Sequence, residues 1–313
     1  MTTKRLLRLQ VRVAVYVAVI AALFLVRGGM DWDRLLSRVP STATPDSTLS
    51  LTGIDLAPEL VDRILAHYRR DYPRVRITAA GGGTNRALEE LANRRTDVAF
   101  LARPPSPDEQ RLFRSAGGDT ALWFPIALGG IAFLQARNSS DSLTVEEIRS
   151  FLGDEAGPRF DRLYAPDPNL GLWDAFLGVL SVFPPGTPPP VVFLESEHAV
   201  IESVRGDPRS LGLASSLSLP EDLEPLGVRT VAVRSGAGAW AFPTYHAVGS
   251  GDYPLRHHLL VSCRGNGGIQ GAKFVTHLTS ARGQRQVERA GFLPARRVLR
   301  EIVLTRNAPG ESE

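Results

Sequence analysis

The sequence is poor in the residues that build reactive sites. Only one of its 313 residues is a cysteine, which excludes an intramolecular disulfide and a thiolate metal cluster. That residue, Cys263, follows the apolar residues 259–261, so we expect an inert thiol buried in a strand. A Gly-x-Ser-x-Gly elbow, a phosphate-binding lysine loop and a paired-carboxylate motif are also absent. We therefore predict a protein that is not an enzyme.

Histidines with the spacing of metal ligands are missing too. The six histidines are scattered along the chain. His257 and His258 are adjacent in a predicted strand, where successive side chains point to opposite faces, so they cannot chelate one ion. We predict neither a metal nor a cofactor.

Acidic residues are absent from the N-terminal segment, and this explains the positive net charge. The chain has 36 basic and 33 acidic residues, but Lys4, Arg5, Arg8, Arg12 and Arg27 lie in that segment. Without these five, 31 basic residues stand against 33 acidic ones, and no basic stripe with interleaved aromatics remains. We expect no nucleic-acid partner.

The N-terminal apolar run, residues 13–26, is short for a membrane span. It has 14 residues, whereas a full span needs about 20. This length fits a signal peptide, but no small-x-small cleavage site follows at the right distance. With Leu6, Leu7 and Leu9 added and Arg12 snorkelling, a short uncleaved anchor also fits. The positive flank predicts a cell-membrane protein whose C-terminal domain is extracytoplasmic, or a secreted or periplasmic protein if the segment is cleaved.

Strand and helix patterns alternate from residue 49 onward, which indicates an α/β layered domain with a mainly parallel sheet. Ligands of such sheets bind beyond the carboxyl ends of the strands. Three predicted turns occupy this edge, at residues 53–55, 81–84 and 102–103. The second turn joins a strand to a helix through three glycines, so the free N–H groups and dipole of the helix favour a small anion there. A bare tight turn is the alternative.

Seven short segments follow one another in a recognisable order. They are Leu56-Ala57-Pro58, Gly81-Gly82-Gly83, Asp97-Val98-Ala99 with Ala102-Arg103-Pro104, residues 143–153, residues 205–213, residues 251–255, and Phe274 with residues 280–284 and 290–294. In this order they resemble the extracytoplasmic phosphate-binding protein of phosphate ABC transporters, over roughly residues 49–297. The resemblance implies an α/β, two-lobed type II periplasmic-binding-protein fold with two crossovers, here preceded by an N-terminal membrane helix.

The resemblance also implies a division of the chain and a ligand site. The predicted parts are a signal anchor or signal peptide (1–27), a linker (28–48), the first part of lobe 1 (49–125), lobe 2 (126–233), the second part of lobe 1 (234–300) and a tail (301–313). A small phosphate-like anion would lie between the lobes, and an ABC permease would be the partner. The candidate ligand-binding residues are Asp55, Leu56, Gly81, Gly82, Gly83, Thr84, Arg103 and Gly171.

Several positions depart from the pattern of that family. Asp55 stands where a threonine or serine is usual, and Ala102 where a serine or aspartate is usual. In the loop of the second lobe Pro166 replaces an arginine, while Leu170 and Leu172 replace a serine and a threonine. Because a buried phosphate needs nearly all of its oxygens paired, these losses predict a degenerate anion site. We predict a membrane-tethered solute-binding protein with such a site; the alternative is a sensory or protein-interaction domain that has lost or changed its ligand.

Some residues allow two interpretations. Asp55 either selects the ligand or caps the helix that follows it, and the cap is favoured. Arg103 either binds an anion or forms a surface salt bridge. Trp173 and Trp240 either stack on a ligand or pack in the core, and core packing is favoured. The glycine-rich residues 234–240 are expected to form a hinge loop.

Overall fold

The structure, a computed structural model, describes residues 47–115, 119–139, 142–152, 160–181, 191–266 and 268–296. The predicted anchor and most of the predicted linker lie outside these residues. Among the described residues, no helix has the length and apolar character needed to cross a bilayer. This finding contradicts the predicted cell-membrane localisation, which had rested on residues 13–26. The described residues belong to one compact unit, and the following paragraphs concern this unit.

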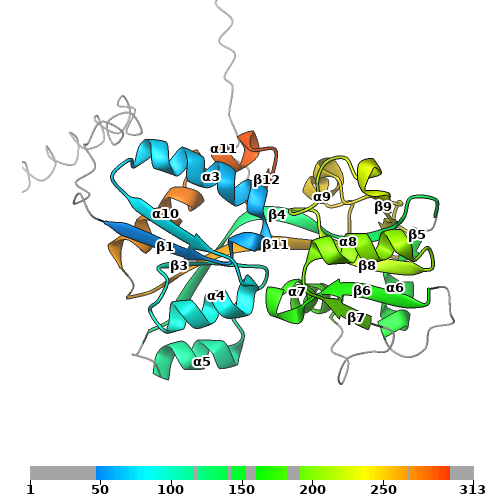
Figure 1. Cartoon of the computed structure of the whole chain (residues 1–313), viewed down its shortest axis with the longest axis horizontal. Helices are drawn as coiled ribbons and strands as arrows, with labels where there is room; N and C mark the ends of the chain where they lie inside the picture. The colour runs from blue at the N-terminus through cyan, green and yellow to red at the C-terminus, as the bar shows by residue number, and fades with distance from the viewer. Residues whose placement is uncertain are drawn as a thin grey trace, which may run out of the picture. The chain divides into compact units, whose positions relative to one another are not determined.

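The described chain alternates strands and helices (Figure 1). The strands are β1 (Thr48–Thr52), β2 (Arg76–Ala80), β3 (Val98–Leu101), β4 (Ala121–Ala136), β5 (Ser142–Thr144), β6 (Arg162–Pro166), β7 (Val191–Leu194), β8 (Ser210–Ser215), β9 (Val228–Thr230), β10 (Ala232–Arg234), β11 (Arg256–Arg264) and β12 (Leu293–Pro294). The α-helices are α3 (Pro58–Asp71), α4 (Gly83–Ala92), α5 (Pro107–Ser115), α6 (Val145–Leu152), α7 (Leu172–Leu180), α8 (Glu197–Gly206), α9 (Tyr245–Ser250), α10 (Ile269–Thr279) and α11 (Ala281–Arg289). Short 3-10 helices are η1 (Ile54–Leu56), η2 (Pro168–Leu170) and η3 (Glu224–Leu226).

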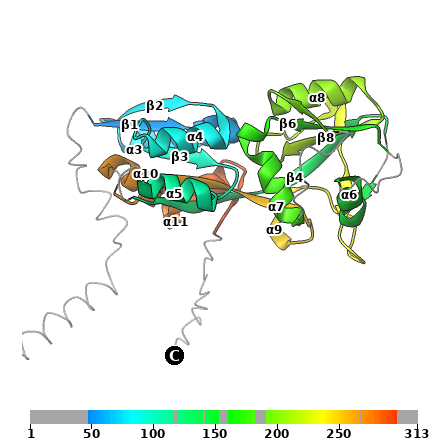
Figure 2. The same cartoon turned by 90° about the horizontal axis from the view of Figure 1, so that it is seen from below.

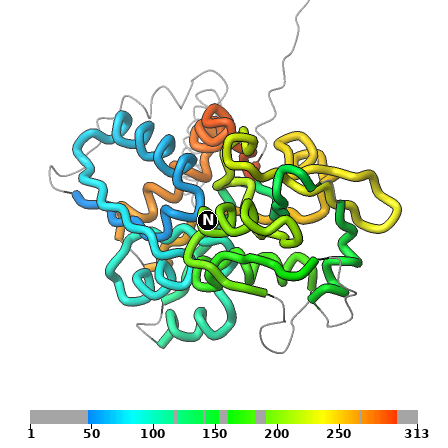
Figure 3. Tube along the Cα trace, turned by 45° about the vertical axis from the view of Figure 1, so that its right-hand side comes forward, coloured from blue at the N-terminus to red at the C-terminus, as the bar shows by residue number. Residues whose placement is uncertain are grey.

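Lobe 1 is built on the strand order β2-β1-β3-β11-β4. The first three strands are parallel, whereas β11 runs antiparallel to both of its neighbours. Figure 3 shows the consequence: the blue and cyan N-terminal part and the orange C-terminal part of the chain interleave in one body. Residues far apart in the sequence therefore share one sheet.

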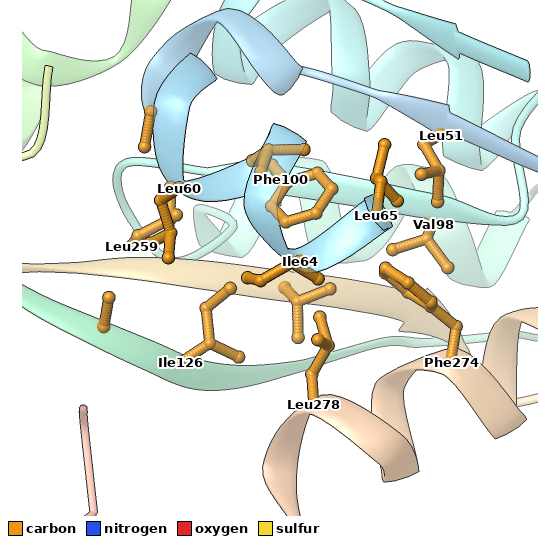
Figure 4. Packing of buried hydrophobic residues seen from close by; sticks show 14 of the residues in the cluster. Leu51, Leu60, Ile64, Leu65, Val98, Phe100, Ile126, Leu259, Phe274 and Leu278 are labelled. Atoms are coloured by element: carbon orange, nitrogen blue, oxygen red, sulfur yellow. The ribbon is translucent and has the colours of Figure 1, made fainter. Parts of the chain in front are cut away.

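Helices α3 and α10 pack on one face of this sheet because their apolar residues recur at helical spacing. Leu60 and Ile64 of α3 lie one turn apart and are at most 1% exposed. They share a core with Phe100 of the sheet and with Phe274 and Leu278 of α10 (Figure 4). A separate cluster, which joins Leu88 and Leu91 of α4 to Phe113 of α5, includes buried residues of β3 and β11. Both faces of the lobe 1 sheet are thus covered.

Lobe 2 continues the sheet in the order β4-β8-β6-β7, with β9 also paired to β4. Its core joins Phe133 of β4, Phe176 of α7 and Leu213 of β8. Helix α6 begins with a reciprocal cap: Glu147 N donates to Thr144 Oγ1, and Thr144 N donates to Glu147 Oε2. The start of α6 is therefore capped by residues of its own segment.

The long strand β4 runs through both lobes (Figure 2). Its first part pairs with β11 of lobe 1, and Ile131 is the first residue to pair with β8 of lobe 2. Glycines stand at this crossing because other elements approach the backbone there. A Cβ at Gly129 would lie 2.6 Å from Leu217 Cγ, and one at Gly130 would lie 2.8 Å from Pro243 Cβ.

The return to lobe 1 comes later in the chain than the sequence indicated. The second part of lobe 1 was expected to begin at residue 234, but β9 pairs with β4 and β10 pairs with β5, beside lobe 2. Val248 and Tyr253 lie in the lobe 2 core, and the Tyr253 hydroxyl donates to Ile131 O at 2.6 Å. The second crossing is made by the residues entering β11, so residues 234–240 are not its hinge. A strand's partner is set by long-range pairing, and its local pattern does not reveal it.

Candidate functional site

The glycine turn lies at the carboxyl end of β2, as the sequence predicted. Gly82 and Gly83 have φ values of 118° and 68°, in the region that glycine alone enters readily. Helix α4 begins at Gly83, so the first N–H groups of the helix have no partner within it. These groups and the helix dipole favour an anion at this position.

The anionic group at this turn is the side chain of Asp55. Gly82 N donates to Asp55 Oδ2 at 2.9 Å, and Gly83 N donates to Asp55 Oδ1 at 3.2 Å. The cap of α3 is Ala57, with no side-chain hydrogen bond, so the prediction that Asp55 caps the following helix is wrong. Asp55 instead caps α4, from a separate segment of the chain. Its two oxygens make the contacts that a bound oxyanion would make.

Thr84 joins the two lobes at the first turn of α4. It is fully buried, and its Oγ1 accepts from Ala102 N at 2.9 Å. The same hydroxyl donates to the carbonyl oxygen of Leu170 in η2 at 2.8 Å. The hydroxyl that we expected to face a ligand therefore contacts lobe 2.

Backbone meets backbone beside this hydrogen bond, where η2 lies against the start of α4 (Figure 1). A Cβ at Gly83 would lie 2.6 Å from Leu170 Cα, and one at Gly171 would lie 2.4 Å from Thr84 Oγ1. Gly171 also has a φ of 89°, which favours glycine. Both glycines thus permit the close contact of the lobes.

Arg103, at the end of β3, is enclosed by acceptors. Its side chain is 14% exposed and donates twice to Glu109, at 2.8 and 2.9 Å. It also donates to Asp174 of α7 at 2.8 Å and to Asn85 Oδ1 at 2.8 Å. The hydrogen bond to Glu109 raises the pKa of Arg103 above its ordinary value. Every N–H of the guanidinium is engaged, because Nη1 also donates to Pro104 O.

The structure thus brings seven of the eight predicted site residues together, and their binding of a ligand stays a prediction. Gly81 lies against Asp55, since a Cβ there would lie 3.1 Å from Asp55 Cγ. Leu56 is the exception: it is 8% exposed and packs into the lobe 1 core.

The predictions for Trp173 and Cys263 are confirmed, whereas the prediction for Trp240 is wrong. Trp173 is buried against Phe176 and Phe193, which confirms core packing. Trp240 is 44% exposed and lies under the guanidinium of Arg234, 4.4 Å from its ring centre, so core packing is wrong for this residue. Cys263 is buried, as expected.

Three residues of the site were missed in the sequence. Glu109 and Asp174 neutralise Arg103 from two different elements. Asn169 accepts from Asn85 Nδ2 across the lobes at 3.0 Å. Only Glu109 carried a local signal, because Ser106 and Glu109 form a capping box at the start of α5.

Comparison with known proteins identifies the fold. Residues 39–157 match the family model of a PBP superfamily domain. A solved structure from Clostridium perfringens, described as a phosphate ABC transporter substrate-binding protein with bound phosphate, superposes with a TM-score of 0.65 at 17% identity, covering 80% of this chain and 100% of that one. An ABC-type phosphate transport receptor from Vibrio cholerae gives 0.61 at 16% identity, covering 79% and 100%. The predicted type II periplasmic-binding-protein fold is confirmed.

Regulatory domains share the same fold. The CcmR regulatory domain from Synechocystis, in complex with 2-PG, superposes with a TM-score of 0.50 at 11% identity, covering 74% of this chain and 95% of that one. A curated relative, the HTH-type transcriptional activator CmpR from Synechocystis, is 38% identical over 58 residues. That match spans only 18% of this chain and 19% of the relative. The fold is therefore common to carriers and regulators.

Proposed function

We propose that this domain is a sensory or protein-interaction domain on the periplasmic-binding-protein fold, and that it does not carry phosphate with high affinity. One observation supports this most directly: the Asp55 carboxylate accepts the N–H groups of Gly82 and Gly83. A phosphate at this turn would have to displace that carboxylate or lie beside its charge. Two like charges about 4 Å apart near a protein surface repel by about 4 kcal/mol. This corresponds to a loss of roughly a thousandfold in affinity.

The other groups of the site support the same proposal. Arg103 is held by the carboxylates of Glu109 and Asp174, and a ligand would have to compete with both. Thr84 and Asn85 bond across to η2, so the chain's own side chains hold the lobes against each other. A domain whose lobes are held together in this way keeps one surface without a bound solute, and that surface is available to another protein.

A second candidate function is a solute-binding protein that delivers a phosphate-like anion to an ABC permease. The neighbour with the TM-score of 0.65 has phosphate bound, and the glycine turn is shaped for an anion. Under this function, binding of the anion would displace Asp55 and open the contacts between Thr84 and Leu170.

Titration calorimetry on the full-length protein separates the two functions. We expect no binding of phosphate, sulfate or molybdate tighter than about 10 μM. Asp55→Thr removes the internal carboxylate, and we expect its affinity for phosphate to be at least about tenfold higher than that of the wild type. The exposed Asp62 on α3 supplies the control Asp62→Thr, which should behave as the wild type. Wild-type binding of phosphate tighter than about 10 μM, or about −7 kcal/mol, would favour the carrier instead.

A further inference from the structure

A second groove lies at the β2 edge of the lobe 1 sheet. It is bounded by β1, β2, the Arg86 and Glu90 side of α4, and the chain that follows α4, and has a volume of about 160 Å³. Among the strands that the structure describes, β2 ends the sheet order and pairs with β1 alone. The groove therefore lies where the described sheet has no further strand.

Hydroxyl groups line the floor of this groove. Ser50 pairs with Thr78 and Thr52 with Ala80, so the side chains of Ser50, Thr52 and Thr78 share one face of the two strands. Thr52 is only 5% exposed, and within the described part of the chain nothing hydrogen-bonds its side chain. Thr52 lines the groove, so its hydroxyl is available to a ligand there.

Charged side chains form the opposite wall. Arg86 has no ion pair or hydrogen bond with any residue that the structure describes. Glu90 lies one helical turn further along α4, and its Oε2 accepts from Arg95 Nε at 3.0 Å. The groove thus combines a free guanidinium, which recognises oxyanions with two parallel hydrogen bonds, with hydroxyl and carboxylate groups that suit ligand hydroxyls.

We propose that this groove is a binding site for a small polyol phosphate. The phosphate group pairs with Arg86, and the hydroxyl groups of the ligand bond to Thr52, Thr78 and Glu90. The volume of about 160 Å³ is below that of sites for drug-sized molecules, about 300–1,000 Å³, so the groove suits only a small ligand. The site does not depend on the function proposed above, since it uses neither the Gly82 and Gly83 N–H groups nor Arg103.

Binding of glycerol 3-phosphate to the full-length protein tests this site, with inorganic phosphate and glycerol as comparison ligands. We expect saturable binding of glycerol 3-phosphate, weaker binding of phosphate and none of glycerol. Arg86→Gln should weaken binding at least about tenfold, because it removes a charge-assisted pair. Thr52→Val, which keeps the shape of the side chain, should weaken it several-fold.

Two controls make the outcome decisive. Arg69→Gln changes an exposed arginine near the end of α3 and should leave the affinity unchanged. Asp55→Thr alters the glycine turn and should also leave the affinity for glycerol 3-phosphate at this groove unchanged. The proposal is overturned if the wild type shows no saturable binding up to about 10 mM, or if Arg86→Gln binds as well as Arg69→Gln.

Discussion

Replacing Gly171 with alanine should weaken the contact between the lobes. Its φ of 89° costs a non-glycine residue roughly 1–2 kcal/mol. The new Cβ would lie 2.4 Å from Thr84 Oγ1, so the lobes must shift apart or Thr84 must rotate. Either movement breaks the hydrogen bond from Thr84 to Leu170, which contributes about 1 kcal/mol net. We therefore expect Gly171→Ala to lower the free energy of unfolding by about 2–3 kcal/mol.

Gly178 in the same segment supplies the matched control. It lies inside α7, and a Cβ there would meet no atom within 4 Å. Alanine is a better helix former than glycine, so Gly178→Ala should raise the free energy of unfolding by up to about 1 kcal/mol. Urea unfolding measures both changes, and small-angle scattering should show a larger radius of gyration for Gly171→Ala alone. Equal stabilities of the two variants would refute the described contact between Thr84 and Gly171.

Two further predictions concern buried charges. Burial raises the pKa of Glu197 to about 7 from 4.5, so the native carboxyl holds a proton that the unfolded chain has released. The stability that this group contributes is therefore lost as the pH rises from about 4.5 to 7. Over that range, the free energy of unfolding of Glu197→Gln should rise by up to about 3 kcal/mol relative to that of the wild type. A difference between the two proteins that does not change with pH would contradict the raised pKa. Asp119 pairs with Arg264 at 2.7 Å, with side chains 2% and 6% exposed, so Asp119→Ala should cost about 3–5 kcal/mol in urea unfolding. Asp108→Ala, which breaks an exposed pair with Arg111, should cost less than about 1 kcal/mol, and similar losses in the two variants would be inconsistent with the buried pair.

Local patterns predicted the elements of the fold well. The box formed by Thr144 and Glu147 marks the start of α6, and the apolar residues of α3 recur at the spacing of one helical face. Alternation of strands and helices indicated the layered α/β architecture, and the order of short segments indicated the two lobes. These features depend on residues a few positions apart, whose interactions follow from backbone geometry.

Strand partners and exposure were predicted less well. The chain was expected to return to lobe 1 at residue 234, yet β9 and β10 pair beside lobe 2 and Tyr253 still lies in the lobe 2 core. Trp240 was expected in the core and is exposed beneath Arg234. A short apolar strand has the same pattern in either lobe, and a tryptophan near the end of a strand has no local signal that reveals its neighbour.

The glycine turn shows which part of the site the sequence predicts and which part only the tertiary structure decides. Three successive glycines between a strand and a helix predicted, without any structure, free N–H groups at the start of that helix, with a bare tight turn as the alternative. Only the tertiary structure decided what those groups meet. Asp55 is 27 residues from Gly82 in sequence, and Asp174 is 71 residues from Arg103. A cap formed by neighbouring residues, such as Thr144 and Glu147, is visible in a sequence. A cap supplied by a distant segment, and a contact across two lobes, depend on how separate segments pack.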